Sequence, residues 1–386
     1  MQRINLLFVI TKLELGGAQK QLLSLISGLD QDKFKPFLFT AQDGLLIPEA
    51  SAINGLTLKK SRCLERAINP LKDLLALIEL YWFIKRNNIE IVHTHSSKAG
   101  ILGRWAAKLA KVKVTLHTVH GWSFNAYQPM PVQLFFIWLE RLAARFCDKI
   151  IVVSDYDKRE GLSKRIGGGN KYALIRYGLD YGEFNNAEQN IREELKIDTD
   201  DLLVGMIACL KPQKSPQDFI KLASLVHKIS PDVKFLLVGD GALRRRLQKL
   251  IHKFNLQKQV VLTGWRRDIP QILSAIDVFV LTSLWEGLPI SVLEAMASSK
   301  PVISTHTGGV QEVVAEGKAG FLVAPHDMNK MSERLLIVLK NKNLRIQMGQ
   351  NARAGLNSNF TLSNMIKESC NLYEDLIKRK GAKHVN

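Results

Sequence analysis

Two glutamates in the second half of the chain have the spacing and surroundings of a site for a phosphorylated sugar. Glu286 opens a Glu-Gly-Leu-Pro turn, and Glu294 is a lone charge in the apolar segment that follows. If Pro289 starts a helix there, as its fixed φ permits, the free N–H groups of Ile290 and Ser291 point toward an anion such as a diphosphate. A carboxylate in apolar surroundings needs a hydrogen-bonding partner, and the vicinal hydroxyls of a ribose would suit Glu294. Spacing alone also allows an ordinary turn glutamate and a solvated glutamate on the outer face of the helix.

Short β-rich runs alternate with helical periods, and this alternation predicts how the glutamates are positioned. In the first half we expect strands at residues 4–10, 34–40, 89–95, 113–120 and 149–154, and helices at 16–29, 71–87, 98–110 and 131–146. In the second half we expect strands at 202–210, 233–241, 259–265, 277–283, 301–309 and 320–325, and helices at 216–229, 242–254, 269–275, 328–341 and 361–380, besides the one after Pro289. The pattern is typical of an α/β fold built on parallel sheets.

A polar stretch at residues 177–201 interrupts the alternation, which then restarts. We therefore expect two Rossmann-like, doubly wound domains, residues 1–180 and 181–360, and a C-terminal helix within 361–386 that crosses back to the first domain. Ligands bind such sheets at the carboxyl ends of the strands. Two facing sheets could then share one ligand in the cleft between them.

The composition indicates a globular protein of the reducing cytoplasm. A chain of 386 residues is too long for a single domain with one hydrophobic core. The four cysteines form no C-x-x-C pair, and no apolar stretch is long enough to span a bilayer. No small-residue cleavage site follows the first apolar run, so we expect no signal peptide. The net charge is +18, of which residues 1–180 contribute 26 − 15 = +11. Such a surface attracts nucleic acid, anionic lipid or phosphorylated substrates.

The run EGLPISVLEAMA, which contains both glutamates, resembles the E-x7-E signature of the retaining glycosyltransferases of family 4, which have the GT-B fold. The resemblance extends over nearly the whole chain. It includes the glycine loop Gly16-Gly17 after the first strand, His120 in HTVHGW, the exit Tyr177-Gly178-Leu179-Asp180, Lys214 in ACLKPQKSP, and the second glycine loop Gly308-Gly309. Each motif is weak alone, and their common order and spacing make the resemblance specific.

The resemblance implies a role for each of these residues. The two glycine loops would approach the donor diphosphate and the donor sugar. Lys214 and the helix start at residues 290–291 would stabilise the leaving diphosphate, and Glu286 would hold and orient the sugar. His120 would hydrogen-bond the transferring sugar or the nearby acceptor, and Glu294 would bind the ribose. Retention of configuration by same-face attack is expected, with no metal or other cofactor.

One position departs from the family pattern. The family usually has an arginine five residues before the lysine, and this chain has Cys209 there. Lys211 is two residues further on, and alternation along a strand would give it the side-chain direction of residue 209. We therefore expect Lys211 to replace the missing diphosphate cation.

Other candidate residues favour other interpretations. The D-x-D pattern in DTDD, residues 198–201, lies in the polar linker and is interpreted as a surface loop rather than a metal site. His93 and His95 end an expected strand on one face, which favours a lining role over metal ligation. The first half is also rich in basic and aromatic residues: Lys98, Arg104, Trp105, Lys108, Lys111, Lys113, Phe135, Phe136 and Trp138. Either they dock on an anionic membrane, or the aromatic residues pack in the core and the lysines form a solvated face.

These observations favour a cytoplasmic glycosyltransferase, peripheral on the inner face of the plasma membrane. It would move a hexose or N-acetylhexosamine from a nucleotide sugar, a UDP-sugar above all, to a lipid-diphosphate-linked saccharide in surface polysaccharide synthesis. Two alternatives stay open: a GT-B-like nucleotide-sugar epimerase, and a non-catalytic module that binds nucleotides or nucleic acid. No nucleic-acid-binding motif accompanies the positive charge, which disfavours the last.

Overall fold

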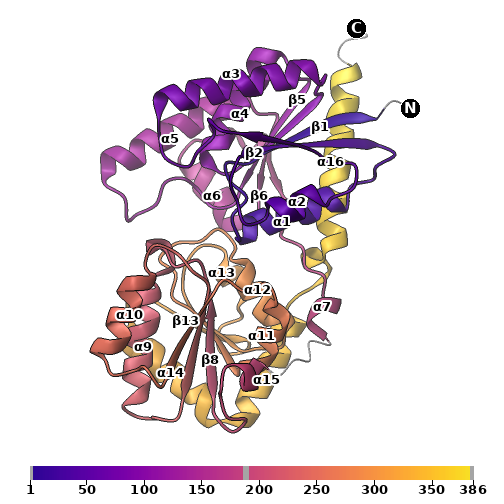
Figure 1. The fold of residues 1–386 in the computed structure, drawn as a ribbon. Helices are drawn as coiled ribbons and strands as arrows, with labels where there is room; N and C mark the ends of the chain where they lie inside the picture. The colour runs from indigo at the N-terminus through magenta and orange to yellow at the C-terminus, as the bar shows by residue number, and fades with distance from the viewer. Residues whose placement is uncertain (1–2, 186–190, 383–386) are drawn as a thin grey trace. The chain divides into compact units, whose positions relative to one another are not determined.

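The computed structural model describes residues 3–185 and 191–382, which form two compact α/β units (Figure 1). Unit 1 comprises Met1–Gly178 and Leu362–Asn386, and unit 2 comprises Leu179–Thr361. The chain therefore changes units within two residues of the expected boundaries at 180 and 360. In the described part of the chain, no helix is long and apolar enough to cross a membrane.

Unit 1 is built on a seven-stranded parallel sheet in the order β3-β2-β1-β4-β5-β6-β7. The interior strand β1 is apolar on both faces because helices cover both: Leu6 and Phe8 face one core, and Leu7 and Val9 face the other. The strands are β1 (Ile4–Val9), β2 (Phe34–Ala41), β3 (Thr57–Ser61), β4 (Ile91–His95), β5 (Val114–Val119), β6 (Lys149–Val152) and β7 (Tyr172–Leu174).

The helices of unit 1 divide between the two faces of this sheet (Figure 1). On one face lie α1 (Gly17–Ser27), α2 (Ile47–Ser51) and the C-terminal helix α16 (Leu362–Ala382), which buries Tyr373 in the same core as Leu6 and Phe8. On the other lie α3 (Pro70–Arg86), α4 (Ser97–Ala110), α5 (Met130–Arg145) and α6 (Asp155–Ser163), with the 3-10 turn η1 (Gly169–Lys171) before β7.

Unit 2 has a six-stranded parallel sheet in the order β10-β9-β8-β11-β12-β13. Its strands are β8 (Leu203–Ile207), β9 (Lys234–Val238), β10 (Val260–Gly264), β11 (Val278–Leu281), β12 (Val302–Thr305) and β13 (Gly320–Val323). Its helices are α7 (Gly182–Asn185), α8 (Ile191–Glu194), α9 (Pro216–His227), α10 (Arg244–Lys253), α11 (Ile269–Ala275), α12 (Ile290–Ala297), α13 (Val310–Val313), α14 (Met328–Lys340) and α15 (Lys342–Ala354), with turns η2 (Pro212–Lys214) and η3 (Ser358–Phe360).

The α/β class and the two doubly wound sheets are confirmed, and every expected strand is present. The sequence missed the two edge strands of unit 1, because β3 has a Lys-Lys pair in place of an apolar run and β7 has three residues. It also missed α6 and α15, whose exposed faces are strongly polar. The expectation that two helices close the chain was therefore wrong, since α14, α15 and α16 follow the last strand.

Candidate active site

The charged candidates of unit 2 meet at the point where the strand order of its sheet reverses. Strand β8 pairs with β9 on one side and β11 on the other. Lys214 ends the turn that follows β8, and Glu286 lies in the loop that follows β11. The two loops leave the carboxyl ends of adjacent parallel strands, where doubly wound sheets bind their ligands.

Lys214 and Glu286 form an ion pair, with 2.5 Å between lysine Nζ and glutamate Oε1. The side chains are 16% and 6% exposed, so little water screens the pair. Gln213 joins the two loops next to this ion pair. Its side-chain amide donates to the Trp285 backbone carbonyl at 2.8 Å, and its backbone carbonyl accepts from the Leu284 N–H at 2.8 Å. The ammonium group has three N–H donors, so two remain for a ligand.

The second glycine loop packs directly on the backbone beside Glu286. Gly308 has a φ of +54°, and a Cβ at this position would lie 2.0 Å from the Glu286 carbonyl oxygen. Gly309 donates its N–H to the Gly287 carbonyl at 2.6 Å. Only glycine permits this approach, so the loop after β12 joins the loops after β8 and β11 in one constellation.

Glu294 is buried in α12, with 7% of its surface exposed. All but the first residue of this eight-residue helix are buried, so it has no solvated outer face at position 294. The alternative of a solvated helix glutamate is therefore wrong. A carboxylate at this depth requires polar partners.

The start of α12 lies within one residue of the expected position. Pro289 is the N-cap with a φ of −73°, and Ile290 is the first helical residue. Ser291 is 6% exposed. The first N–H groups of a helix have no partner within it, so those of Ile290 and Ser291 are the groups that could bind an anion.

The geometric argument for Lys211 does not hold. Strand β8 ends at Ile207, and Lys211 is the N-cap of the turn η2. Side chains alternate in direction only within a strand. Because residues 209 and 211 lie beyond the end of β8, their spacing of two does not show that their side chains point the same way. The half-buried Lys211 does lie three residues from Lys214, with its carbonyl accepting the Lys214 N–H at 3.0 Å.

In unit 1 the first glycine loop and His120 follow β1 and β5, two strands that β4 separates. Gly16 is the N-cap of α1, Gly17 is its first residue, and both follow β1. His120 comes directly after β5 and is half-buried. These residues therefore lie at the carboxyl edge of their sheet, as Lys214 and Glu286 do in theirs.

Both ring nitrogens of His120 have partners. Nε2 lies 2.9 Å from Nδ1 of His95, and Nδ1 lies 2.6 Å from the hydroxyl of Tyr177. Burial lowers the pKa of His120 to about 4, so the imidazole is neutral at neutral pH. A neutral imidazole has one donor and one acceptor, and both are engaged here. Binding a sugar hydroxyl through the ring therefore requires exchange of one partner.

His93 and His95 lie on one face of β4, as expected, with ring centroids 4.2 Å apart. His93 is fixed between the hydroxyls of Tyr373 and Thr118, each 2.7 Å from a ring nitrogen. Burial lowers the pKa of His93 to about 3. Within residues 3–185 and 191–382, no cluster of three or more His, Cys, Asp or Glu side chains is placed to hold a metal ion.

Tyr177 is a site residue whose side chain the sequence did not single out. It appeared only as part of the exit from the first domain, two residues before unit 2 begins. Gln21 of α1 fastens this exit, because its amide exchanges two hydrogen bonds with Gly178, at 2.9 and 3.0 Å. Helix α1 therefore contacts the exit segment at Gly178, and the ring of His120 contacts the same segment at Tyr177.

Two residues expected on a docking surface are placed elsewhere. Arg104 is fully buried and forms a 2.7 Å ion pair with Glu140, because α4 and α5 pack together at this point. Lys98 pairs with Asp73 at 2.6 Å and donates to the Ala67 carbonyl, with 13% of its side chain exposed. These charges are paired within unit 1 and are mostly or fully buried.

The comparisons with known proteins agree with this geometry. Residues 15–181 match the family described as Glycosyltransferase Family 4, and residues 187–355 match Glycosyl transferases group 1. A curated Escherichia coli protein, UDP-Gal:alpha-D-GlcNAc-diphosphoundecaprenol alpha-1,3-galactosyltransferase, is 34% identical over 378 residues, which cover 94% of this chain and 97% of the relative. This chain is a family 4 glycosyltransferase.

A further relative of this glycosyltransferase supports the general activity, and two solved structures support the fold. The putative glycosyltransferase EpsD of Bacillus subtilis is 28% identical over 78% of the chain and 81% of its own length. The crystal structure of Anabaena Alr3699/HepE with UDP-glucose superimposes with a TM-score of 0.84 at 20% identity, covering 97% of this chain and all of that one. The crystal structure of WaaG, a glycosyltransferase involved in lipopolysaccharide biosynthesis, superimposes with a TM-score of 0.78 at 16% identity. The match covers 95% of this chain and 99% of that one. The fold is GT-B.

Proposed function

We propose that this glycosyltransferase moves a hexose or N-acetylhexosamine from a UDP-sugar to a lipid-diphosphate-linked saccharide, with retention of anomeric configuration, in surface polysaccharide synthesis. The observation that carries the proposal is the ion pair of Lys214 and Glu286 at the strand-order reversal of unit 2. The pair would offer one cation to a diphosphate and one carboxylate to a sugar at the carboxyl ends of the strands, where such sheets bind ligands. The name of the Escherichia coli relative, which states a UDP-sugar donor and a diphosphoundecaprenol acceptor, supports the substrate classes.

Charge development at the leaving group explains the roles in unit 2. Cleavage of the sugar–diphosphate bond leaves negative charge on the diphosphate. The Lys214 ammonium and the N–H groups of Ile290 and Ser291 would stabilise that charge. Glu286 would accept hydrogen bonds from sugar hydroxyls and hold the anomeric carbon in position, and buried Glu294 would accept them from the ribose.

In unit 1, the backbone at Gly16 and Gly17 would approach the donor diphosphate, and His120 would hydrogen-bond the transferring sugar or the acceptor. A neutral imidazole suits this role, because it donates and accepts without adding charge beside an oxocarbenium-like centre. One of His95 and Tyr177 would keep its contact and orient the ring, while the sugar hydroxyl replaces the other. The glycines Gly308 and Gly309 of unit 2 would approach the donor sugar.

The proposed reaction needs no metal, because Lys214 and the start of α12 supply the positive field that a divalent cation would otherwise provide. Transfer should therefore proceed at an unchanged rate in excess EDTA. A rate that falls with EDTA and returns with Mg²⁺ or Mn²⁺ would overturn this part of the proposal.

A lipid-linked acceptor would bring the enzyme to the inner face of the plasma membrane. We propose that it binds there peripherally, since residues 1–180 have a net charge of 26 − 15 = +11. Anionic lipid headgroups attract such a surface.

The test is an assay of the purified protein with UDP-, GDP- and ADP-sugars, with and without a short-chain lipid-diphosphate saccharide. Acceptor-dependent release of UDP and an α-linked product from an α-linked donor are expected. Conversion of a UDP-sugar into its epimer without acceptor would favour the epimerase. Absence of nucleotide release, transfer and nucleotide binding would leave only a non-catalytic module.

A further inference from the structure

Exposed apolar side chains gather on one face of unit 1. Of the twenty large hydrophobic side chains that are exposed in the described chain, fourteen fall between residues 68 and 138. Twelve of them belong to α3, α4 and α5, which lie on the same face of the sheet with α4 in contact with both neighbours (Figure 1). This three-helix face consists of Leu71, Leu74, Leu75, Ile78, Trp82, Trp105, Leu109, Met130, Val132, Leu134, Phe135 and Trp138.

Helix α3 shows that these exposed residues form a second apolar stripe. One side of the helix buries Ala76, Leu80 and Ile84 against the sheet. The opposite side exposes residues at helical spacing, and Ile78 and Trp82 are 45% and 52% exposed. A surface helix of a globular protein normally has a polar outer face, so a helix with two apolar stripes indicates a partner for the outer one.

The acidic side chains of the three helices are turned away from this face. Only Asp73, Glu79 and Glu140 occur in α3, α4 and α5. Asp73 pairs with Lys98, Glu79 pairs with Lys59 at 2.9 Å, and Glu140 pairs with buried Arg104. The three-helix face therefore presents apolar and basic groups without a competing exposed carboxylate.

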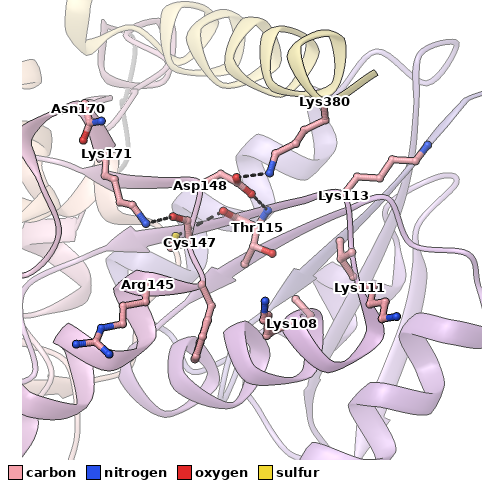
Figure 2. Close-up of a pocket in the computed structure, with 13 residues that line it drawn as sticks. Lys108, Lys111, Lys113, Thr115, Arg145, Cys147, Asp148, Asn170, Lys171 and Lys380 are labelled. Atoms are coloured by element: carbon pink, nitrogen blue, oxygen red, sulfur yellow. Dashed lines mark hydrogen bonds and ion pairs between the residues drawn. The ribbon is translucent and has the colours of Figure 1, made fainter. Parts of the chain in front are cut away.

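Basic residues gather where α4 and α5 end (Figure 2). They border an open cavity of about 560 Å³ at the amino ends of β5 and β6, which Lys108, Lys111, Lys113, Arg145, Lys171 and Lys380 line. Three of these cations are engaged within the fold: Lys380 pairs with Asp148 and Lys113 with Glu90, each at 2.7 Å, and Lys171 donates to the carbonyls of Ala144 and Cys147. The side chains of Lys108, Lys111 and Arg145 are exposed (Figure 2), and the Lys108 ammonium lies 5.8 Å from the centroid of the Phe146 ring.

We propose that the three-helix face is the membrane-docking surface, with its apolar side chains in the lipid interface and Lys108, Lys111 and Arg145 against anionic headgroups. Exposed tryptophans beside basic residues are typical of interfacial helices. A two-fold contact with a second copy would bring the same basic groups near one another, which disfavours self-association. The inference rests on the proposed use of a lipid-linked acceptor.

The experiment measures binding of the full chain to phosphatidylcholine vesicles with and without phosphatidylglycerol, by co-sedimentation. The apolar variant is Ile78→Ser/Trp82→Ser/Trp138→Ser, and the matched control in unit 2 is Ile337→Ser/Ile346→Ser, which also replaces exposed residues. Wild type and control should bind vesicles that contain phosphatidylglycerol, and the apolar variant should partition at least about ten-fold more weakly. Equal thermal melting of the proteins shows that each is folded.

The basic variant Lys108→Gln/Lys111→Gln/Arg145→Gln tests the headgroup contacts separately. Three lost charges should lower partition onto anionic vesicles roughly 100-fold at low salt. Wild-type binding should weaken with added salt and with removal of phosphatidylglycerol.

Release of UDP from the donor, measured in detergent, distinguishes this inference from the proposed function. All variants should release UDP at the wild-type rate. Vesicle binding by the apolar variant at the wild-type level, or a wild-type dimer that the apolar variant dissociates, would overturn the docking surface while the transferase stands. Vesicle binding without any UDP-sugar turnover would retain the surface and overturn the function.

Discussion

The two units share one architecture and differ in where they place charge and apolar surface. Unit 2 concentrates an ion pair, a buried carboxylate and a helix start at the carboxyl ends of its strands. Its exposed large hydrophobic residues are few and scattered, since the described part of unit 2 has only Ile229, Trp265, Ile337 and Ile346. Unit 1 buries neutral histidines at the equivalent edge and exposes three amphipathic helices.

The difference suggests a division of labour that the shared fold alone does not imply. A leaving diphosphate requires fixed positive charge, and in unit 2 the mostly buried Lys214 would supply it. A lipid-linked acceptor requires access to a membrane and a neutral group near the reacting sugar. Under the proposed function, each unit would have the surface that suits one of the two substrates.

The largest expected effect is loss of the cation of unit 2. Lys214→Ala should lower kcat about 10²–10³-fold, because a preorganised group that stabilises leaving-group charge contributes on that scale. Lys221→Ala is the matched control, since Lys221 also pairs with a carboxylate, Asp218 at 2.8 Å, but within helix α9. Steady-state kinetics with a UDP-sugar should show a near wild-type control. Equal losses in both variants would mean that unit 2 is sensitive to any lost ion pair and that Lys214 has no special role.

The second expected effect is on the stability of unit 1 in acid. Burial holds the pKa of His93 at about 3, below the usual value of 6.5, so folding favours the neutral ring. The unfolded chain therefore binds more protons below pH 6.5, and the free energy of unfolding should fall as pH drops from 6.5 toward the folded pKa. One unit of pKa shift corresponds to about 1.4 kcal/mol, so the expected loss exceeds that value.

Urea unfolding between pH 7 and pH 4, followed by hydrogen exchange, tests this expectation. The loss should be confined to amides of unit 1, and His93→Gln should reduce the pH slope whatever its effect at pH 7. The histidines of unit 2 within the described chain lie at or near the surface. Acid destabilisation that is uniform over both units would remove this contrast.

A smaller effect is expected from the hydroxyl that orients His120. Tyr177→Phe removes the 2.6 Å contact to Nδ1, and kcat should fall about ten-fold with little change in the donor KM, since one oriented hydrogen bond contributes about 0.5–1.5 kcal/mol. Tyr373→Phe is the control, because it removes a similar contact to His93. It should lower stability and leave kcat nearly unchanged. A larger loss of kcat in Tyr373→Phe would indicate that the whole histidine cluster acts as a unit.

Much of this arrangement could be predicted from the sequence, because local patterns determine it. Apolar runs and helical periods predicted the strands and the main helices, and glycine, lysine and glutamate motifs predicted residues that the structure brings together around Lys214, Glu286 and Gly308. The partners of His120 could not be predicted, since Tyr177 and His95 meet it only through the sheet register. The burial of Arg104 could not be predicted either, because it depends on the packing of α4 against α5.

The smallest expected effect concerns the position that departs from the family pattern. Lys211 remains our proposed substitute for the arginine absent at Cys209, although the strand argument for it fails. Lys211→Ala should raise the donor KM or lower kcat roughly three-fold, less than Lys214→Ala, because a half-exposed cation near a phosphate contributes under about 1 kcal/mol. Cys209→Arg should compensate for the loss in the double variant. Unchanged KM and kcat in Lys211→Ala would leave Lys214 and the start of α12 as the proposed positive groups for the diphosphate in unit 2.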